Sequence, residues 1–300
     1  MERVLTLVGA AGASLPSPDW VDRLRQSLDT HGVESEAQRW LAPGLACDMK
    51  VAPKAEALGP EVWMELLQSV DLDWALLPAH GRRKKLLLAD MESTIITQEM
   101  IDELAEAAGL GPEIADVTRR AMAGEMAFAG ALRERVARFS GLSVALLQQI
   151  SHRITFNPGA KTLVGTMAAR GAYCALVSGG FSFFTAQVRE TCGFHEDRAN
   201  ELIVEDGRIT GRVREPILGP EAKERALQEL VAKRNLTADE VCAVGDGAND
   251  LEMLAAAGLG VAFHGKPAVR AAARFRVDHG DLTSLLYFQG YHRDEFVVSR

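Results

Sequence analysis

Three short apolar runs along the chain each end in polar or glycine residues. They are residues 86–89, followed by Asp90, residues 175–177, followed by Ser-Gly-Gly, and residues 241–244, followed by Gly-Asp-Gly-Ala-Asn-Asp. Unbroken apolar runs of this length are typical of strands that are buried on both faces of a parallel sheet. The carboxyl ends of such strands lie along one edge of the sheet, where α/β proteins bind their ligands. We therefore expect carboxylates, a hydroxyl and glycine amides to converge there.

The residues between and after these runs predict helices. Residues 97–155 form a long tract rich in Ala, Glu, Leu and Arg, which predicts a helical cap inserted after the first core strand. Lids of this kind keep water away from a reacting group. Strand–helix alternation resumes at Asn157, and an Asp-Gly turn predicts a β-hairpin over residues 202–213. The fold class is therefore predicted to be α/β, with a Rossmann-like parallel sheet as its core.

The first 80 residues predict a separate, smaller α+β unit. Strands are expected at residues 4–8, 34–41, 45–51 and 74–77, and helices at residues 19–29, with Ser17 as N-cap, and 60–70. That βαββαβ order is ferredoxin-like. The basic run 82–85 marks the boundary to a second domain over residues 84–300. We interpret this run as a solvated strand entrance rather than a nucleic-acid patch.

Composition narrows the functional classes. The formal net charge of −8 argues against binding to nucleic acid or an anionic membrane, and no apolar run approaches the ~18 residues that a membrane span needs. The four cysteines have no CxxC spacing, which suits a reducing cytoplasm. The apolar start of the chain resembles a signal peptide, but Glu2 offsets the charge of Arg3, and a first strand explains the run better. We therefore expect a cytoplasmic protein.

Asp90 by itself has two interpretations. Ser93 and Thr94 follow it and a helix is predicted from near Gln98, so Asp90 could be a helix N-cap. The second acidic strand end, which begins at Asp246, favours a chemical role instead. Converging carboxylates repel one another unless a cation lies between them, and oxygen ligands at this density suit Mg²⁺. An Asp-Gly turn is the structural alternative for the second acidic motif.

Four motifs resemble those of the haloacid-dehalogenase-like hydrolases. They are DMEST at 90–94, VSGG at 177–180, Lys223, and GDGANDL at 245–251, in that order and with the helical insertion where the family has it. The resemblance covers about residues 84–290 and is strongest to the branch that hydrolyses L-phosphoserine in bacterial serine synthesis. Residues 1–80 resemble, much more weakly, the ACT-like domain that often precedes these enzymes.

The resemblance implies a role for each motif residue. Asp90 would be the nucleophile, which forms an aspartyl-phosphate and so splits the hydrolysis into two easier steps. Mg²⁺ would be bound by Asp90, by the backbone carbonyl of Glu92 and by Asp246, with Asp250 supporting the site. The phosphate would contact four residues, namely Ser178, Gly179, Lys223 and Asn249.

Glu92 departs from the pattern of the family, which has Asp at this position. There the Asp protonates the leaving serine oxygen and then deprotonates the attacking water, and Glu carries the same group on one more methylene. A displacement of about 1 Å can lower a rate about 10²-fold when geometry matters. By resemblance, Glu92 is expected to be the general acid/base, and the sequence leaves open whether its loop has adjusted to the extra methylene.

Four cap residues are expected to select the substrate. By resemblance, Glu99 would face the ammonium group of phosphoserine and Arg135 its carboxylate, while Met122 and Phe128 would close the apolar wall. Arg135 has a second interpretation, as part of a solvated helix face with Glu134. A charged pair that matches a zwitterion would discriminate against a phosphate ester without those charges, because buried charges left unpaired are unfavourable.

Three functions fit these residues. The leading one is Mg²⁺-dependent hydrolysis of L-phosphoserine. The alternatives are a phosphotransferase or phosphatase for another small phosphomonoester, and a non-catalytic amino-acid sensor, which only Glu92 supports. We expect a small-molecule substrate and neither nucleic acid nor membrane as partner. The sequence leaves the oligomeric state open, a homodimer included.

Overall fold

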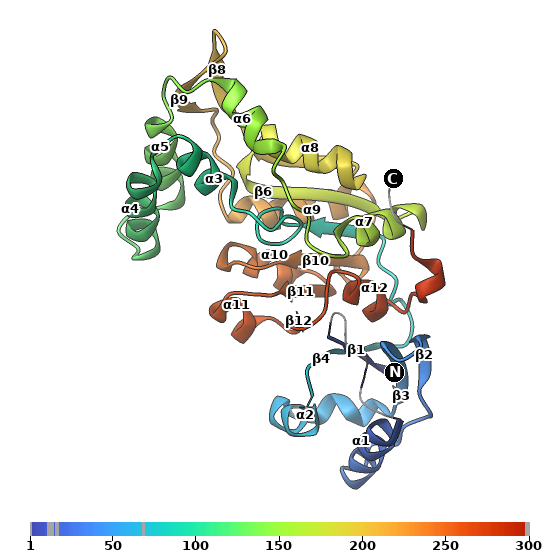
Figure 1. Ribbon diagram of the computed structural model, residues 1–300. Helices are drawn as coiled ribbons and strands as arrows, with labels where there is room; N and C mark the ends of the chain where they lie inside the picture. The colour runs from blue at the N-terminus through green and yellow to red at the C-terminus, as the bar shows by residue number, and fades with distance from the viewer. Residues whose placement is uncertain (1, 11–14, 16–17, 68–69, 298–300) are drawn as a thin grey trace.

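The structure, a computed structural model, describes residues 2–10, 15, 18–67 and 70–297. Within these residues the strands form a four-stranded, a six-stranded and a two-stranded sheet. Figure 1 shows the N-terminal unit on one side of the six-stranded sheet and the helical cap beyond its other side. The predicted α/β class with an inserted cap and a preceding α+β unit is confirmed.

The N-terminal unit has the predicted βαββαβ order. Its elements are β1 (Arg3–Gly9), α1 (Pro18–Thr30), β2 (Arg39–Ala42), β3 (Ala46–Val51), the short 3₁₀ helix η1 (Pro53–Ala57), α2 (Pro60–Leu67) and β4 (Leu72–Pro78). The strands pair antiparallel in the order β2-β3-β1-β4. β2 is shorter than expected, because residues 34–38 form only an isolated bridge from Ser35 to Val51. The predicted N-cap Ser17 lies outside the described residues.

The six-stranded sheet is parallel throughout, in the order β12-β11-β10-β5-β6-β7. Its elements are β5 (Leu86–Ala89), α7 (Ala160–Ala169), β6 (Tyr173–Phe181), α8 (Ser182–Cys192), β7 (Glu196–Asn200), α9 (Glu221–Lys233), β10 (Val241–Gly245), α10 (Leu251–Ala256), β11 (Leu259–Phe263), α11 (Pro267–Ala272), β12 (Phe275–Val277) and α12 (Ser284–Phe288). The three strands that the apolar runs predicted are the central ones. Every residue of β5 and β10 is buried, because helices cover both faces of the sheet.

The two edge strands were not predicted from the sequence. β7 reads Glu-Asp-Arg-Ala-Asn and is half-buried over most of its length, while β12 has only three residues. Edge strands carry fewer apolar residues because one side of the backbone and part of each face meet solvent. Neither strand therefore leaves an apolar run in the sequence.

The cap combines two segments of the chain. The first contains α3 (Met100–Ala107), α4 (Gly111–Met122), α5 (Phe128–Arg138) and α6 (Val144–Ser151), and the second is the hairpin of β8 (Leu202–Glu205) and β9 (Arg208–Val213). The hairpin joins the loop after α5 through backbone hydrogen bonds from Gly141 to Ile209 and from Ile209 to Leu142. Figure 1 shows the hairpin beside α5 and α6. The sequence predicted the hairpin but not that it extends the cap.

The N-terminal sheet packs on both of its faces. Leu5, Leu7 and Met49 are buried in a cluster under α1 and α2. Val8 and Leu77 belong instead to the large cluster that fills the second domain. β4 lies against β12, and α12 lies against β1 and β4. The two units are therefore joined by a continuous apolar contact, and the predicted boundary falls in the connection from β4 to β5.

Among the described residues, the structure has no helix that is both long and apolar enough to span a membrane.

Candidate active site

Asp90 lies directly after β5, at the carboxyl end of a central strand. It is not a helix N-cap, because turns occupy the following residues and α3 begins only at Met100. The neighbouring strands β10 and β6 end beside it. The order of connection reverses between β5 and β10, and this is where open parallel sheets leave room for a ligand.

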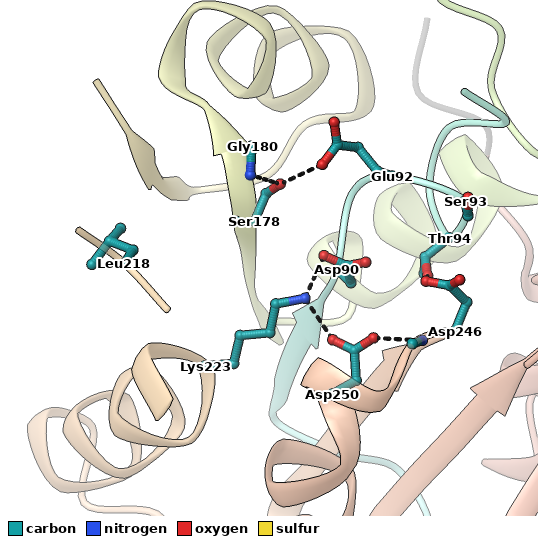
Figure 2. Close-up of polar contacts among 12 residues, drawn as sticks. Asp90, Glu92, Ser93, Thr94, Ser178, Gly180, Leu218, Lys223, Asp246 and Asp250 are labelled. Atoms are coloured by element: carbon teal, nitrogen blue, oxygen red, sulfur yellow. Dashed lines mark hydrogen bonds and ion pairs between the residues drawn. The ribbon is translucent and has the colours of Figure 1, made fainter. Parts of the chain in front are cut away.

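Lys223 connects two of the acidic residues. It lies in the first turn of α9, and its buried Nζ is 2.6 Å from Asp90 Oδ1 and 2.6 Å from Asp250 Oδ1. Figure 2 shows this ammonium group between the two carboxylates. Asp250 Oδ2 accepts a hydrogen bond of 2.9 Å from the amide of Gly247. Because the other oxygen contacts Lys223 and the side chain is buried, Asp250 is held in one orientation.

Three carboxylates could hold a divalent cation. Oxygen atoms of Asp90, Asp246 and Asp250 all lie within 4.8 Å of one another, and the three side chains are buried. Thr94 Oγ1 lies 3.5 Å from Asp246 Oδ1. An all-oxygen set of this charge is what Mg²⁺ prefers in proteins, so the residues present fit the predicted metal.

Burial and charge act in opposite directions on this cluster. Burial raises the pKa of Asp90 well above its usual value, and Lys223 opposes that rise. Burial lowers the pKa of Lys223, but Asp90 and Asp250 outweigh it and hold the ammonium group charged. A divalent cation beside Asp90 would favour its ionised form further, and an ionised carboxylate is the form that can act as a nucleophile.

The Ser-Gly-Gly sequence is the carboxyl end of β6 and not the loop after it. Ser178 Oγ accepts a hydrogen bond of 2.9 Å from the amide of Gly180. A Cβ atom on Gly180 would lie 2.8 Å from Glu92 Oε2, and one on Gly179 would lie 3.1 Å from the ring of Phe128. Glycine at these positions therefore leaves room for the close approach of the Glu92 carboxyl and of the Phe128 ring.

Glu92 links the cap to the sheet. Its Oε1 accepts a hydrogen bond of 2.9 Å from the amide of Met100, at the start of α3. Its Oε2 lies 3.5 Å from Ser178 Oγ. Figure 2 marks this contact with a dashed line. Burial and the nearby carboxylate of Glu99 raise the pKa of Glu92 to about 7. The longer side chain of Glu thus reaches the centre of the site and stays half protonated near neutral pH.

Glu99 and Arg135 border the same space from the cap. Glu99 Oε1 accepts a hydrogen bond of 2.8 Å from Ser93 Oγ. The half-buried Arg135 has no ion pair within 4.0 Å among the described side chains, and its Nε contacts only the carbonyl of Ala131, at 3.4 Å. Burial lowers the pKa of Arg135, while Asp102, Glu92 and Glu99 oppose that change. The carboxylates of Asp102, Glu92 and Glu99 are thus near enough to act on the charge of Arg135.

Glu134 does not pair with Arg135. It forms ion pairs with Arg120 and Arg138 instead. Glu134, with which the alternative interpretation grouped Arg135 on a solvated helix face, therefore pairs with other arginines, while Arg135 itself is half-buried.

Phe128 and Met122 have different surroundings. Phe128, the first residue of α5, lies against Gly179. Met122, the last residue of α4, is 83% exposed and lines a hollow of about 550 Å³ with Asp102 and Arg119. The structure thus brings Phe128 to the end of β6, whereas Met122 is exposed and lines a hollow whose lining includes none of the motif residues. Asn249 lies half-buried in the turn after β10, between Asp246 and Asp250 in sequence.

Two residues near the site were missed from the sequence. Buried Asn200, at the end of β7, donates hydrogen bonds to the carbonyls of Gly179 and Leu218, at 2.8 and 3.2 Å. Asn200 thereby ties the end of β6 to the loop that leads to Lys223. The second is Lys266, whose Nζ lies 3.1 Å from Asp246 Oδ2. Neither belongs to an apolar run or a motif that the sequence singled out.

Known proteins with similar sequences and folds agree with this architecture. The sequence profile of haloacid dehalogenase-like hydrolases matches residues 87–255. A curated phosphoserine phosphatase from Streptococcus thermophilus is 41% identical over 203 residues, which are 68% of this chain and 94% of that protein. The chain is also 41% identical over 220 residues, 73% of its length, to the phosphoserine phosphatase of Archaeoglobus fulgidus, of which it spans only 64%.

A solved structure resembles the whole chain. The crystal structure of a haloacid-dehalogenase-family hydrolase from Salmonella enterica serovar Typhi superposes with a TM-score of 0.84. The two are 27% identical, and the match covers 98% of this chain and 99% of that one, so it includes the N-terminal unit. Together with the profile match over more than half of the chain, these similarities show that the protein belongs to the haloacid dehalogenase-like hydrolases.

Proposed function

We propose that this protein is a Mg²⁺-dependent phosphatase that hydrolyses L-phosphoserine to L-serine and phosphate, the last step of serine synthesis. One observation carries the proposal: a buried aspartate at a strand end, bound by a lysine, lies within ligand distance of two further aspartates. The relatives that bear the name phosphoserine phosphatase support the choice of substrate.

In this proposal Asp90 is the nucleophile. Its carboxylate attacks the phosphorus atom, the bond from phosphorus to the serine oxygen breaks, and an aspartyl-phosphate remains on the protein. Mg²⁺, when bound by Asp90, the carbonyl of Glu92, Asp246 and Asp250, supplies positive charge that offsets the charge of the phosphate. Lys223 holds the Asp90 carboxylate in position through its 2.6 Å contact.

The phosphoryl oxygens would be bound at the end of β6. Ser178 offers its hydroxyl and Gly179 its amide, and Asn249 is proposed as a further contact. Asn200 holds the carbonyl of Gly179, which helps to fix the backbone of this strand end before the substrate arrives. Preorganised donors of this kind stabilise the charge that develops on phosphate without reorganising during the reaction.

Glu92 is proposed as general acid and base. In its protonated form it gives a proton to the departing serine oxygen, and as a carboxylate it takes a proton from the water that hydrolyses the aspartyl-phosphate. A pKa of about 7 lets one residue fill both roles near neutral pH. Its hydrogen bond from Met100 holds the carboxyl group, which supports Glu as a replacement for Asp.

Recognition of the amino-acid part is assigned to the cap. Glu99 would bind the ammonium group and Arg135 the carboxylate, and Phe128 would close the site over Gly179. Met122, exposed here, would complete the apolar wall only if the α4–α5 connection moves inward.

The same proposal includes the assignment of two domains and of a cellular location. Residues 1–80 are proposed as an ACT-like domain and residues 84–300 as the phosphatase domain with its cap at about 97–155. The four cysteines are buried free thiols, which supports a reducing cytoplasm as the location.

The test is a substrate panel. Phosphate release from phosphoserine, phosphothreonine, phosphoethanolamine and p-nitrophenyl phosphate is measured with Mg²⁺ and with a chelator. We expect the highest kcat/KM for phosphoserine and no turnover after chelation. A higher kcat/KM for phosphoethanolamine would contradict the role of Arg135 in binding a carboxylate. Absence of turnover on every ester would favour a sensor.

A further inference from the structure

Lys266, which belongs to none of the four motifs, is a second lysine that contacts the cluster of Asp90, Asp246 and Asp250. Lys266 follows β11, and its Nζ lies 3.1 Å from Asp246 Oδ2 and 3.8 Å from Glu99 Oε1. Lys266 therefore connects Asp246, a proposed metal ligand at the end of the sheet, with Glu99, a proposed substrate-binding residue of the cap.

The backbone of Lys266 is fixed, but its side chain is not. Its amide donates to the carbonyl of Asp246, and its carbonyl accepts from the amides of Val269 and Arg270, all at 2.9–3.0 Å. The side chain is 60% exposed, and a long lysine side chain with solvent beside it can change its rotamer freely. The ammonium group can therefore leave Asp246 without moving the chain.

The negative charges of the three aspartates favour a lysine at the position of Lys266. Asp90, Asp246 and Asp250 bring three carboxylates together, and Lys223 neutralises the first and the last of them. Within the described part of the chain, Lys266 is the cation that pairs with Asp246. Without it, Asp246 would face two other acids in a buried site with no cation paired to it among the described residues, which is unfavourable.

We propose that Lys266 is an exchangeable counter-cation. It pairs with Asp246 while no metal is bound, and it leaves Asp246 when a divalent cation takes that carboxylate. Lys266 so competes with the metal and lowers its affinity in the substrate-free protein, whereas buried Lys223 stays in place. This inference rests on the proposed function, because that function requires the divalent cation.

The experiment measures binding of Mg²⁺ by calorimetry, and of Mn²⁺ by electron paramagnetic resonance, at low ionic strength without substrate. Lys266→Met is expected to bind either metal roughly 3- to 10-fold more tightly than the parent, since a nearby competing charge is gone. Lys266→Arg, which keeps the charge, is expected to resemble the parent. Lys85→Met is the matched control, because Lys85 is a 65% exposed lysine that pairs with Glu240 before the start of β5.

Thermal unfolding gives an independent readout. Loss of the counter-cation should lower the melting temperature of metal-free Lys266→Met by about 1–3 °C and leave the Mg²⁺-saturated protein unchanged. A merely structural role would lower both melting temperatures and would weaken metal binding.

The outcomes separate the two proposals. Metal binding by the parent together with equal or weaker binding by Lys266→Met overturns the role of Lys266 alone. A parent that binds neither metal overturns the proposed Mg²⁺-dependent function, and the role of Lys266 with it.

Discussion

Asp73 and Asp90 are both buried aspartates of the two larger sheets, the first within strand β4 and the second directly after strand β5. Asp73 in β4 is 3% exposed and Asp90 after β5 is 5% exposed. Burial raises the pKa of both carboxyl groups above the usual value. Neither burial nor the direction of the pKa shift therefore separates a structural carboxylate from one that we assign to chemistry.

The hydrogen-bond and ion-pair partners of the two carboxyl groups distinguish Asp73 from Asp90. Asp73 accepts three backbone hydrogen bonds, at 2.7, 3.1 and 2.7 Å, from the amides of Asp278, His279 and Gly280. Both of its oxygens are thereby used to hold the loop after β12 against the N-terminal sheet. Asp90 instead meets Lys223 and two other acids. A cluster of like charges is unfavourable for folding, and its presence indicates a ligand.

The largest expected effect is that of Asp90→Asn. An amide is a poor nucleophile, so turnover of every phosphate ester should fall to background while the protein stays folded. The measurement is phosphate release, with circular dichroism and thermal unfolding as controls for the fold. Activity retained by a purified, folded Asp90→Asn protein would remove the aspartyl-phosphate mechanism.

Glu92→Gln should slow both half-reactions, because Gln neither donates nor accepts the proton. The expected loss of kcat for phosphoserine is about 10²–10⁴-fold. p-Nitrophenolate leaves without protonation, so stopped-flow absorbance should show a burst of p-nitrophenol followed by a slow steady state. No burst of serine should appear with phosphoserine. Turnover of phosphoserine near the parental rate would mean that another group is the acid/base.

The pH dependence of the first half-reaction gives a separate test of Glu92 as the general acid. With a pKa of about 7, Glu92 is mainly protonated below pH 7 and mainly ionised above it. Serine release in a single turnover should therefore fall as pH rises through 7, because the acid form is lost. Rapid-quench assays would measure this, and the falling limb should be absent from Glu92→Gln.

Arg135→Ala should weaken recognition without altering the phosphate site. The KM for phosphoserine is expected to rise about 30-fold, since a carboxylate loses its charged partner, while the KM for p-nitrophenyl phosphate changes little. Arg138→Ala is the matched control, because Arg138 lies on the same helix and pairs with Glu134 at its surface. Equal losses on both esters would show that Arg135 acts on the fold or on phosphate.

The smallest effect on activity is expected from Asp73→Asn. The amide nitrogen that replaces one oxygen cannot accept a backbone hydrogen bond, so the free energy of unfolding should fall by about 1–3 kcal/mol. Activity per folded molecule should stay within about twofold of the parent. Denaturant unfolding and active-site titration measure the two quantities. Asp71→Asn, at a nearby side chain that is 88% exposed, should leave stability unchanged.

An opposite result would end the comparison drawn between the two aspartates. If Asp73→Asn lowered activity far more than stability, the N-terminal sheet would act on the reaction through the loop after β12. If Asp90→Asn unfolded the protein, its carboxylate would have the same structural role as that of Asp73.

Sequence reasoning was most successful where the signal is local. Three apolar runs located the central strands β5, β6 and β10, because a strand buried on both faces must be apolar at every position. The polar residue after each run located the candidate site, because parallel strands end at one edge. The Asp-Gly turn located the hairpin of β8 and β9 to the residue.

The tertiary structure alone decided what depends on contacts between distant residues. The hairpin could not be assigned to the cap, Asn200 to the strand end at Gly179, or Lys266 to Asp246, because no local pattern records such pairs. The same holds for Asp73, which lies one residue before the strand predicted at residues 74–77 and belongs to no motif. What the amino-acid sequence determined by itself is the order of buried strands and the polar residues at their ends. Which lysine pairs with which acid, and which acid only holds a loop, is decided by packing across the chain, where burial makes each unpaired charge unfavourable.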